Sequence, residues 1–337
     1  MSFLGPLAFA DSPIQNLSIF DPASPPAASI RDLTFLVFAI TGFIFVVVEG
    51  VLIYTLIRFR RSRNAGSEPP QVYGSKPIEI AWTAAPALIV FILILVTTRT
   101  LWEVEIITPK PKAGDGALFV TVTGRQWWWQ YTYDHYDGKE LGFTTANELH
   151  VPFSPAGVAK PIYLILESAD VCHSFWVPRL AGKTDLLPGR TNHMWFQPDQ
   201  PGLFVGQCAE YCGTQHANML LRVVVEPQED FERWLAGEQK PAVENPNLLE
   251  DKAAFFAQTC VNCHRIRGTP AAGAFGPDLT HLRSRATLAS GMIPNTAENL
   301  RRWIDDPQKI KPGCLMPAFG LSDGDRDRIV AYLQSLR

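Results

Sequence analysis

Two groups of metal-binding side chains occur in this chain, and both are of types that carry electrons. The first runs Cys208-Ala-Glu-Tyr-Cys212-Gly-Thr-Gln-His216-Ala-Asn-Met219, with His173 upstream. The second is Cys260-Val-Asn-Cys263-His264. Thiolate, imidazole and thioether ligands together favour copper, whereas the pattern Cys-x-x-Cys-His predicts covalent haem attachment. A chain that holds two redox metals is predicted to move electrons.

The first group holds more soft ligands than a single blue-copper ion needs. Cys208, Cys212 and His216 recur every four residues, and Met219 follows three residues later. Together with His173 they suit two copper ions that share both sulfurs. Two alternatives stay open, namely a Cys208–Cys212 disulfide and a zinc site of the Cys2His2 type.

The second group predicts which side chains hold the haem. Cys260 and Cys263 would form the thioethers, and His264 would be the proximal iron ligand; a redox dithiol is the competing interpretation. A methionine as sixth ligand would raise the reduction potential. Met316 is the candidate and Met292 the alternative.

Two further cysteines have no predicted part in either site. Cys172 lies beside His173 and is predicted to be a small buried hydrophobic residue. Cys314 lies two residues before Met316, and the sequence assigns it no role.

Two apolar stretches near the N-terminus are each long enough to cross a membrane. Residues 33–57 and 80–98 are almost wholly apolar. A helix of about 20 apolar residues crosses a hydrocarbon layer of about 30 Å, so two spans are predicted. Two buried core helices are the alternative. The loop between the stretches holds most of the nearby positive charge, on Arg58, Arg60, Arg61, Arg63 and Lys76.

This charge distribution predicts the topology. The positive-inside rule places the basic loop in the cytoplasm, so both termini and both metal groups face the outside of a bacterial plasma membrane. That side is where c-type haem is attached. Ala8-Phe9-Ala10 is similar to a cleavage site, but no basic region precedes it and a signal peptide is not predicted. The formal net charge of -3 gives no indication of a nucleic-acid partner.

After the second apolar stretch, β-rich segments give way to helical ones. Short β-rich segments separated by Pro, Gly, Asn and Asp predict a sandwich or barrel. The predicted strands are 118–123, 127–133, 162–167, 193–196, 203–206 and 220–225. Residues 227–247 predict a linker with one helical turn at 231–235. The rest predicts a small all-helical domain, with helices over 249–259, from an Asn295 cap to 304, and from a Ser322 cap onward.

These patterns divide the chain into an outer segment (1–32), a transmembrane hairpin (33–98), a β domain (99–226), a linker (227–247) and a helical domain (248–337). Residues 101–226 hold 9 basic and 13 acidic side chains, a net charge of -4, and residues 248–337 hold 12 and 9, a net charge of +3. Opposite charges favour transient docking of the two outer domains, within a Debye length of about 8 Å.

The first group and its surroundings resemble subunit II of haem–copper cytochrome c oxidases over about residues 30–230. The motifs that carry this resemblance are His173-Ser-Phe-Trp-Val-Pro178, residues 206–219, Lys183-Thr-Asp-Leu-Leu-Pro-Gly-Arg190, Gln126-Trp-Trp-Trp129 and Glu79-Ile-Ala-Trp82. The C-terminal part resembles class I cytochrome c through Gly276-Pro-Asp-Leu279 and Met316-Pro317. The whole chain is similar to subunit II of caa-type oxidases, in which a cytochrome c is fused to the CuA subunit.

The resemblance implies a multidomain fold: a two-helix transmembrane hairpin, an all-β cupredoxin sandwich with a dinuclear CuA centre, and an all-α class I cytochrome c domain. The implied ligands of CuA are His173, Cys208, Cys212, His216 and Met219, with the backbone carbonyl of Glu210.

Further roles follow from the same resemblance. The Glu210 carboxylate is implied to reach a magnesium ion at the contact with subunit I. Trp127 is implied to be the surface ring where electrons enter from a cytochrome; otherwise residues 127–129 predict a strand whose rings pack on alternate faces. Glu79 is implied to mark the mouth of a proton channel in the partner subunit; otherwise it is a solvated helix cap.

The predicted function is that of the electron-entry subunit of a terminal oxidase, active only within its complex. A cytochrome c or a quinol–cytochrome c reductase would reduce haem c, and the electron would reach CuA and then subunit I, which reduces oxygen to water and pumps protons. Subunit III and the lipid bilayer are further predicted partners. The alternatives are a subunit of a CuA-dependent nitric oxide reductase and a membrane-tethered copper-binding protein.

Overall fold

The computed structural model describes residues 18–60, 71–106, 116–153, 155, 160–243 and 245–337, without the side chains of residues 105 and 106. The chain forms two compact units, one of residues 28–108 and one of residues 1–27 with 109–337. The cleavage-site motif at residues 8–10 and two arginines of the predicted cytoplasmic loop, Arg61 and Arg63, lie outside the described residues.

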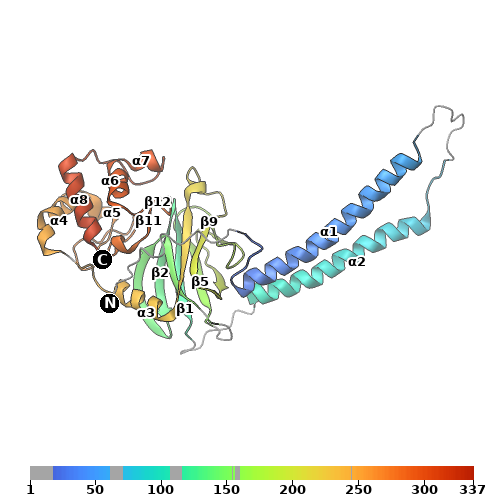
Figure 1. Cartoon of the computed structure of the whole chain (residues 1–337), viewed down its shortest axis with the longest axis horizontal. Coiled ribbons are helices and arrows are strands. Elements are labelled where there is room, and N and C mark those ends of the chain that lie inside the picture. Colours follow the sequence, from blue (N-terminus) through green and yellow to red (C-terminus); the bar gives the residue numbers. More distant parts are fainter. Residues whose placement is uncertain (1–17, 61–70, 107–115, 154, 156–159, 244) are drawn as a thin grey trace. The chain divides into compact units, whose positions relative to one another are not determined.

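The first unit contains two long apolar helices, α1 (Pro25–Arg58) and α2 (Lys76–Leu101), and α2 continues as a π-helical turn, Trp102–Ile106 (Figure 1). Both helices are long and apolar enough to cross a membrane, and the most apolar stretch of each is wholly unburied. That exposure contradicts the alternative of two buried core helices. The helices extend beyond the predicted spans because prolines suit the first helical turn, at Pro25 and Pro77.

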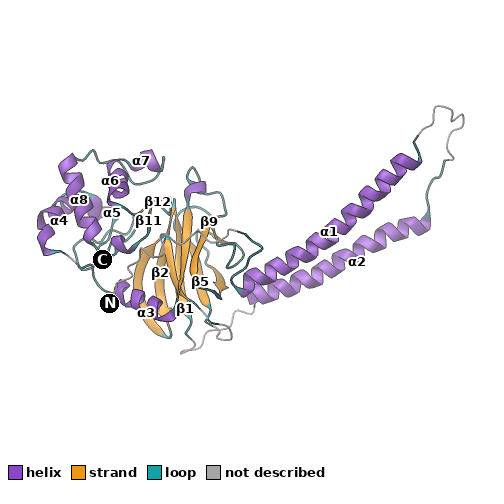
Figure 2. Cartoon of the chain, viewed as in Figure 1, coloured by secondary structure: helices purple, strands orange, loops and turns teal. Residues whose placement is uncertain are grey.

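The second unit contains a β domain of two five-stranded sheets, drawn in orange in Figure 2. One sheet has the order β3-β2-β1-β5-β8 and the other β4-β10-β9-β6-β7. The strands of the first sheet are β1 (Leu118–Arg125), β2 (Trp128–Tyr136), β3 (Lys139–Ala146), β5 (Ile162–Ser168) and β8 (Asn192–Phe196). The strands of the second sheet are β4 (Glu148–Pro152), β6 (His173–Trp176), β7 (Thr184–Leu186), β9 (Gly202–Cys208) and β10 (Leu220–Glu226).

The alternation of buried side chains along β1 and β2 builds the core between the sheets. In β1 Leu118 and Val122 are wholly buried and their neighbours are half-buried, as expected for a strand with one face on the core. In β2 the large rings of Trp129, Tyr131 and Tyr133 are wholly buried. This packing fixes the start of β2, where the Trp129 ring lies 6.1 Å from the His173 ring of the candidate copper site.

Helix α3 (Gln228–Glu238) covers one part of the sandwich. Its Phe231 is wholly buried, and its Trp234 ring stacks on His150 of β4 with ring centroids 4.3 Å apart. The predicted helical turn at 231–235 is therefore part of a longer helix that belongs to the β-domain core.

The helical domain follows, with α4 (Leu249–Phe256), α5 (Cys260–Cys263), α6 (Ala297–Asp305), α7 (Pro307–Ile310) and α8 (Asp323–Ser335). A short two-stranded sheet of β11 (Thr287–Leu288) and β12 (Ile293–Pro294) lies between α5 and α6 in the sequence. Phe255 of α4 packs against Tyr332 of α8 with ring centroids 5.6 Å apart. The domain has its own hydrophobic core, which matches the predicted all-helical character apart from that small sheet.

Two local predictions are wrong. Trp127 precedes β2 rather than belonging to the strand. The cap of α6 is Thr296, whose hydroxyl accepts from the Asn299 amide, whereas Asn295 is buried and donates to the carbonyl of Leu282. Strands β3, β4, β6 and β7 were also not predicted; β3 begins with charged residues, and β6 and β7 are very short.

The Ser322 cap of α8 is confirmed and can be tested. The Ser322 hydroxyl accepts from the Asp325 amide at 3.1 Å. We expect Ser322→Ala to lower the free energy of unfolding of the helical domain by about 1 kcal/mol, because one helical N–H loses its partner. Denaturant titration followed by circular dichroism of the helices measures this. Ser322→Thr retains the cap and is the control; equal losses in both variants would contradict the capping role.

Candidate metal centres

The soft side chains of the first group converge at one end of the sandwich. The sulfurs of Cys208 and Cys212 lie 3.8 Å apart, and Cys212 Sγ lies 3.6 Å from His216 Nδ1. His173 reaches the same place from β6, with Nδ1 3.9 Å from Cys208 Sγ. The separation of the sulfurs is far beyond a disulfide bond, so in this structure the two cysteines are free.

Two more atoms complete this copper cage, which we define as His173, Cys208, Glu210, Cys212, His216 and Met219. Met219 Sδ lies 3.8 Å from Cys212 Sγ, and the Glu210 carbonyl oxygen lies 3.2 Å from Cys208 Sγ. Both cysteines, His173 and Met219 are buried, whereas the Glu210 side chain is exposed. With Met219 in the cage, the donor set is softer than zinc requires.

The two cysteines share a site, which changes their acidity. The contact with Cys212 lowers the pKa of Cys208 to about 3, and the same contact raises the pKa of Cys212. The thiolate is the form of cysteine that binds metals. The geometry therefore prepares at least one thiolate before any metal binds.

A carboxylate outside the cage orients His173. Asp170 Oδ1 accepts from His173 Nε2 at 2.7 Å, and Asp170 is held in turn by the Gln126 and Val171 amides at 2.6 and 2.7 Å. Burial alone would raise the pKa of Asp170. The hydrogen bonds from His173 and from the two amides outweigh burial and lower this pKa. A second-shell carboxylate of this kind fixes which histidine nitrogen faces the metal, here Nδ1.

Gly124 leaves the space that His173 occupies. A Cβ at Gly124 would lie 2.7 Å from His173 Cδ2, closer than side chains tolerate. Gly124 is therefore required at the end of β1, because a larger residue would push the His173 ring out of the cage.

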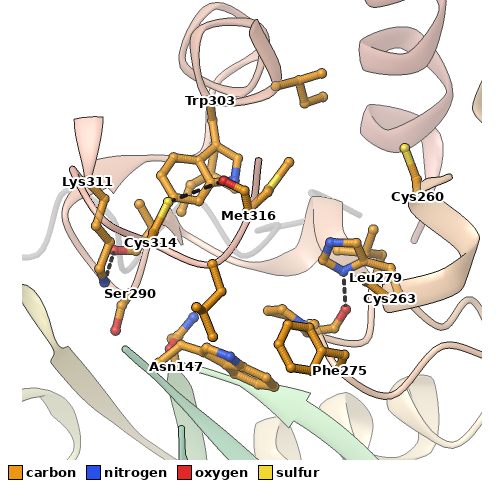
Figure 3. A pocket seen from close by; sticks show the side chains of 18 of the residues that line it. Asn147, Cys260, Cys263, Phe275, Leu279, Ser290, Trp303, Lys311, Cys314 and Met316 are labelled. Carbon is orange, nitrogen blue, oxygen red and sulfur yellow. Dashed lines mark hydrogen bonds between the residues drawn. The ribbon is translucent and has the colours of Figure 1, made fainter. Parts of the chain in front are cut away.

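The second group lines a cavity in the helical domain. Cys260, Cys263 and His264 lie on one side and Met316 on another, as Figure 3 shows for the two cysteines and Met316. His264 Nδ1 donates to the Pro277 carbonyl at 2.7 Å, which leaves Nε2 for a metal. Burial lowers the pKa of His264 and so favours the neutral, metal-binding imidazole.

The loop that carries Met316 is held by one side chain. Gln308 Nε2 donates to the Met316 carbonyl at 3.0 Å and to the Cys314 carbonyl at 2.9 Å. Cys314 also lines the cavity, whereas Met292 is not among its lining residues. Met316 is therefore the methionine that the structure brings to the haem-attachment motif.

The β domain supplies part of the wall of this cavity. Its contributions are Arg125, Gln126, Trp127, Trp128, Asn147 and Asp170, and Figure 3 shows Asn147 and Phe275 along the lower edge of the view. The Trp127 ring is 8% exposed, and its Nε1 donates to the Cys212 carbonyl at 2.9 Å. The predicted surface exposure of Trp127 is therefore not found, and its role in electron entry stays a prediction; the residue lines the cavity and contacts the copper cage.

Sequence reasoning also erred at Cys172 and missed three site residues. Cys172 is exposed rather than buried. Asp170, Gln126 and Gly124 support the cage but had no predicted role; only the position of Asp170, three residues before His173, could have indicated it.

Comparison with known proteins identifies each part of the chain. Residues 118–227 match the family "Cytochrome C oxidase subunit II, periplasmic domain" and residues 12–99 match its transmembrane domain. Residues 250–337 match the family "Cytochrome c". The family of the β domain implies CuA copper, and the cytochrome c domain implies haem.

Two relatives align with this chain over almost its whole length. "Cytochrome c oxidase subunit 2" of Alkalihalophilus pseudofirmus is 35% identical over 326 residues, which is 96% of this chain and 92% of the relative. The protein of that name from Bacillus subtilis is 31% identical and covers 95% and 92%. The solved periplasmic domain of subunit II of cytochrome oxidase from Bradyrhizobium japonicum is 32% identical, with a TM-score of 0.33, over 38% of this chain and 96% of that one.

These matches extend over the membrane helices, the β domain and the helical domain together. Neither a nitric oxide reductase subunit nor a tethered copper-binding protein is favoured by them. The outer domains belong to a membrane protein, and the family works in a complex with oxidase subunit I. The chain belongs to the cytochrome c oxidase subunit II family with a fused cytochrome c domain, and it is an electron-entry component of a terminal oxidase.

Proposed function

We propose that His173, Cys208, Cys212, His216 and Met219, with the carbonyl of Glu210, hold a dinuclear CuA centre in this chain. The observation that supports this most directly is the pair of sulfurs 3.8 Å apart, flanked by one histidine nitrogen each. Two bridging thiolates between two imidazoles suit a pair of copper ions that share one electron. A shared electron changes the geometry of the ligands little on reduction.

Cys260 and Cys263 are proposed to attach haem c, with His264 and Met316 as the axial ligands. The support is the free Nε2 of His264, which its hydrogen bond to Pro277 leaves available, and the position of Met316 on the wall of the same cavity. Gly276 supports the assignment as well, because a Cβ there would lie 2.6 Å from His264 Cε1.

Trp127 is proposed to connect the two redox centres. When bound, haem c and CuA each carry one electron at a time, so the chain needs a short path between them. The Trp127 ring lines the haem cavity, and its Nε1 donates to the carbonyl of Cys212 in the copper cage. Because this ring is nearly inaccessible from solvent, an external donor is proposed to reduce haem c rather than CuA.

The remaining partners follow from the family and the exposed residues. The exposed carboxylate of Glu210 is proposed to bind magnesium at the contact with subunit I. Glu79, in the first turn of α2, is proposed to lie at the mouth of a proton channel in that subunit. The proposed donor is a cytochrome c or a quinol–cytochrome c reductase, and subunit III and the lipid bilayer are proposed neighbours.

The topology is proposed from the described basic residues. Arg58 is the last residue of α1, Arg60 follows it, and Lys76 is the first residue of α2. The short connection between the helices therefore carries positive charge at both ends. Positive charge favours the cytoplasmic side. The chain is therefore proposed to cross a bacterial plasma membrane twice, with both termini and both metal domains outside.

The copper assignment predicts a selective loss. We expect His216→Ala to abolish or shift the near-infrared copper band and the paramagnetic resonance of an electron shared over two coppers, while haem absorbance stays normal, because only one cage ligand is removed. The matched control is His193→Ala, which replaces an exposed histidine of the same domain. An unchanged copper signal in His216→Ala, or one metal atom or zinc in the native cage, would disprove the ligand set.

The axial assignment predicts a change in redox potential. We expect Met316→Leu to lower the reduction potential of haem c by on the order of 0.1 V, since axial ligands set haem potentials over a range of about 0.8 V. Redox titration of the haem absorbance measures it. Met292→Leu is the control and should leave the potential unchanged; the opposite pattern would make Met292 the ligand.

The route through Trp127 predicts a kinetic effect. We expect Trp127→Phe to slow electron transfer from haem c to CuA severalfold, because the variant lacks the Nε1 donor to the Cys212 carbonyl. Time-resolved absorbance after rapid haem reduction measures this rate, and haem and copper contents should match the native protein. Trp195→Phe, on β8 away from the cavity, is the control. Equal rates in both variants would show that the indole of Trp127 is not needed.

A further inference from the structure

Two buried charged side chains cross between the β domain and the helical domain, and neither is a proposed metal ligand. Glu148 starts β4 of the β domain, and Lys311 follows α7 of the helical domain. Glu148 and Lys311 are each only 3% exposed. A buried charge is unfavourable unless it is well hydrogen-bonded, so the partners of these two groups decide what they do.

Among the described residues, the hydrogen-bond donors to the Glu148 carboxylate lie in the helical domain. One oxygen accepts from the Ala286 amide at 2.9 Å, and the other accepts from the Thr287 amide and hydroxyl at 2.8 and 2.6 Å. These residues follow Arg285, which lines the haem cavity. Separating the domains would leave the two amides without these partners.

The Lys311 ammonium makes the reverse connection. It donates to the Trp127 carbonyl at 2.7 Å and to the Asn218 carbonyl at 2.9 Å, both in the β domain. A third acceptor, the Ala289 carbonyl at 3.3 Å, lies in its own domain. Three N–H donors thus have three acceptors, which satisfies the group.

Neutral contacts surround these two anchors. Gln215 Nε2 donates to the Pro312 carbonyl at 2.6 Å, next to Lys311. Ser290 Oγ donates to the Leu220 carbonyl at 2.9 Å, near the Glu148 contacts in the sequence of the helical domain. The interface is therefore specified by hydrogen bonds in both directions rather than by apolar area alone.

The Lys311 contacts join the loops that hold the two redox centres. Asn218 directly precedes Met219 of the copper cage, and Trp127 donates to the carbonyl of Cys212. On the other side, Lys311 lies in the loop that leads to Met316, and Figure 3 shows Lys311, Cys314 and Met316 along one side of the cavity. A shift of Lys311 would therefore change the spacing of both loops.

We infer that Glu148 and Lys311 are positioning residues that lock the cytochrome domain onto the copper domain in one docked arrangement. The inference rests on the function proposed above and adds a restriction to it. The docked arrangement closes the haem cavity with the β domain and covers Trp127, so the fused cytochrome is held in place between turnovers rather than searching for its acceptor on a tether.

The test is amide hydrogen exchange in the complete oxidase, together with the rate of electron transfer from haem c to CuA. We expect Lys311→Met to raise exchange at the Ala286 and Thr287 amides by about tenfold or more, because hydrogen bonds to a charged group shift an equilibrium by that much. Lys311 does not contact these amides, so faster exchange there reports opening of the whole interface. Glu148→Gln should slow the transfer rate, although Glu148 touches neither redox site.

Matched controls separate docking from surface charge. Lys309→Met and Glu250→Gln remove side chains that are 73% and 85% exposed, and should behave as the native protein. Should Lys311→Met fail to assemble, Lys311→Gln keeps an amide with two N–H donors and should give a smaller effect of the same sign. In the native protein, exchange at residues 286–287 should change little with salt, because buried groups are screened weakly.

Three results would overturn the inference. The first is an amide exchange rate at residues 286–287 that is the same in both Lys311 variants as in the native protein. The second is an unchanged rate of electron transfer from haem c to CuA in Glu148→Gln. The third is an amide exchange rate in the native protein that rises steeply with salt. The copper band and haem absorbance of the same samples distinguish a failure of the docking inference from a failure of the proposed function. If those spectra are absent in the native protein, the metal assignments fail; if they are present and docking is unaffected, only the lock fails.

Discussion

The carbonyl of Cys212 accepts from two side chains of the turn before β2, and this contact holds the copper cage and the haem cavity in register. Gln126 Nε2 donates to it at 2.7 Å and Trp127 Nε1 at 2.9 Å. Cys208 ends β9, and the loop after it supplies Cys212, His216 and Met219. Contacts with residues at the start of β2 hold this loop against the first sheet. In the same turn the backbone amide of Gln126 donates to Asp170, and Asp170 orients His173. One turn therefore positions ligands that come from different segments, and the Trp127 ring that it carries forms part of the cavity wall.

The metal-binding residues could be predicted because their chemistry is local in the sequence. Cys208, Cys212 and His216 lie four residues apart, and Cys-x-x-Cys-His is contiguous. The interface could not be predicted in the same way. Glu148 and Lys311 look like any solvated charge in a sequence, and only the folded chain shows that each is buried against backbone groups of the other domain. The burial of Trp127 could not be predicted for the same reason, since the helical-domain residues that line the cavity with it lie more than one hundred residues later.

The net charges of the two outer domains indicate less about how the domains dock than the contacts of Glu148 and Lys311 do. Net charges of -4 and +3 favour approach over a distance set by salt. The anchors have the same signs as the domains that carry them, but they act at hydrogen-bond distance and away from solvent. Long-range charge can raise the rate of approach, whereas buried directional hydrogen bonds fix one orientation. Because the two domains are on one chain, their effective concentration is already high, so orientation is the part that remains to be specified.

The chemistry of Lys311 suits this role better than a buried ion pair would. Among the described residues Lys311 makes no ion pair, and burial lowers the pKa of Lys311 to about 7, although nearby Cys314 and Cys212 act in the opposite direction. Three carbonyl acceptors favour the ammonium, and the neutral amine would still donate two hydrogen bonds. The three carbonyl acceptors therefore hold the Lys311 ammonium without a carboxylate partner. A carboxylate partner at this point would place a further negative charge near an electron acceptor, and backbone carbonyls avoid that while they still fix the geometry.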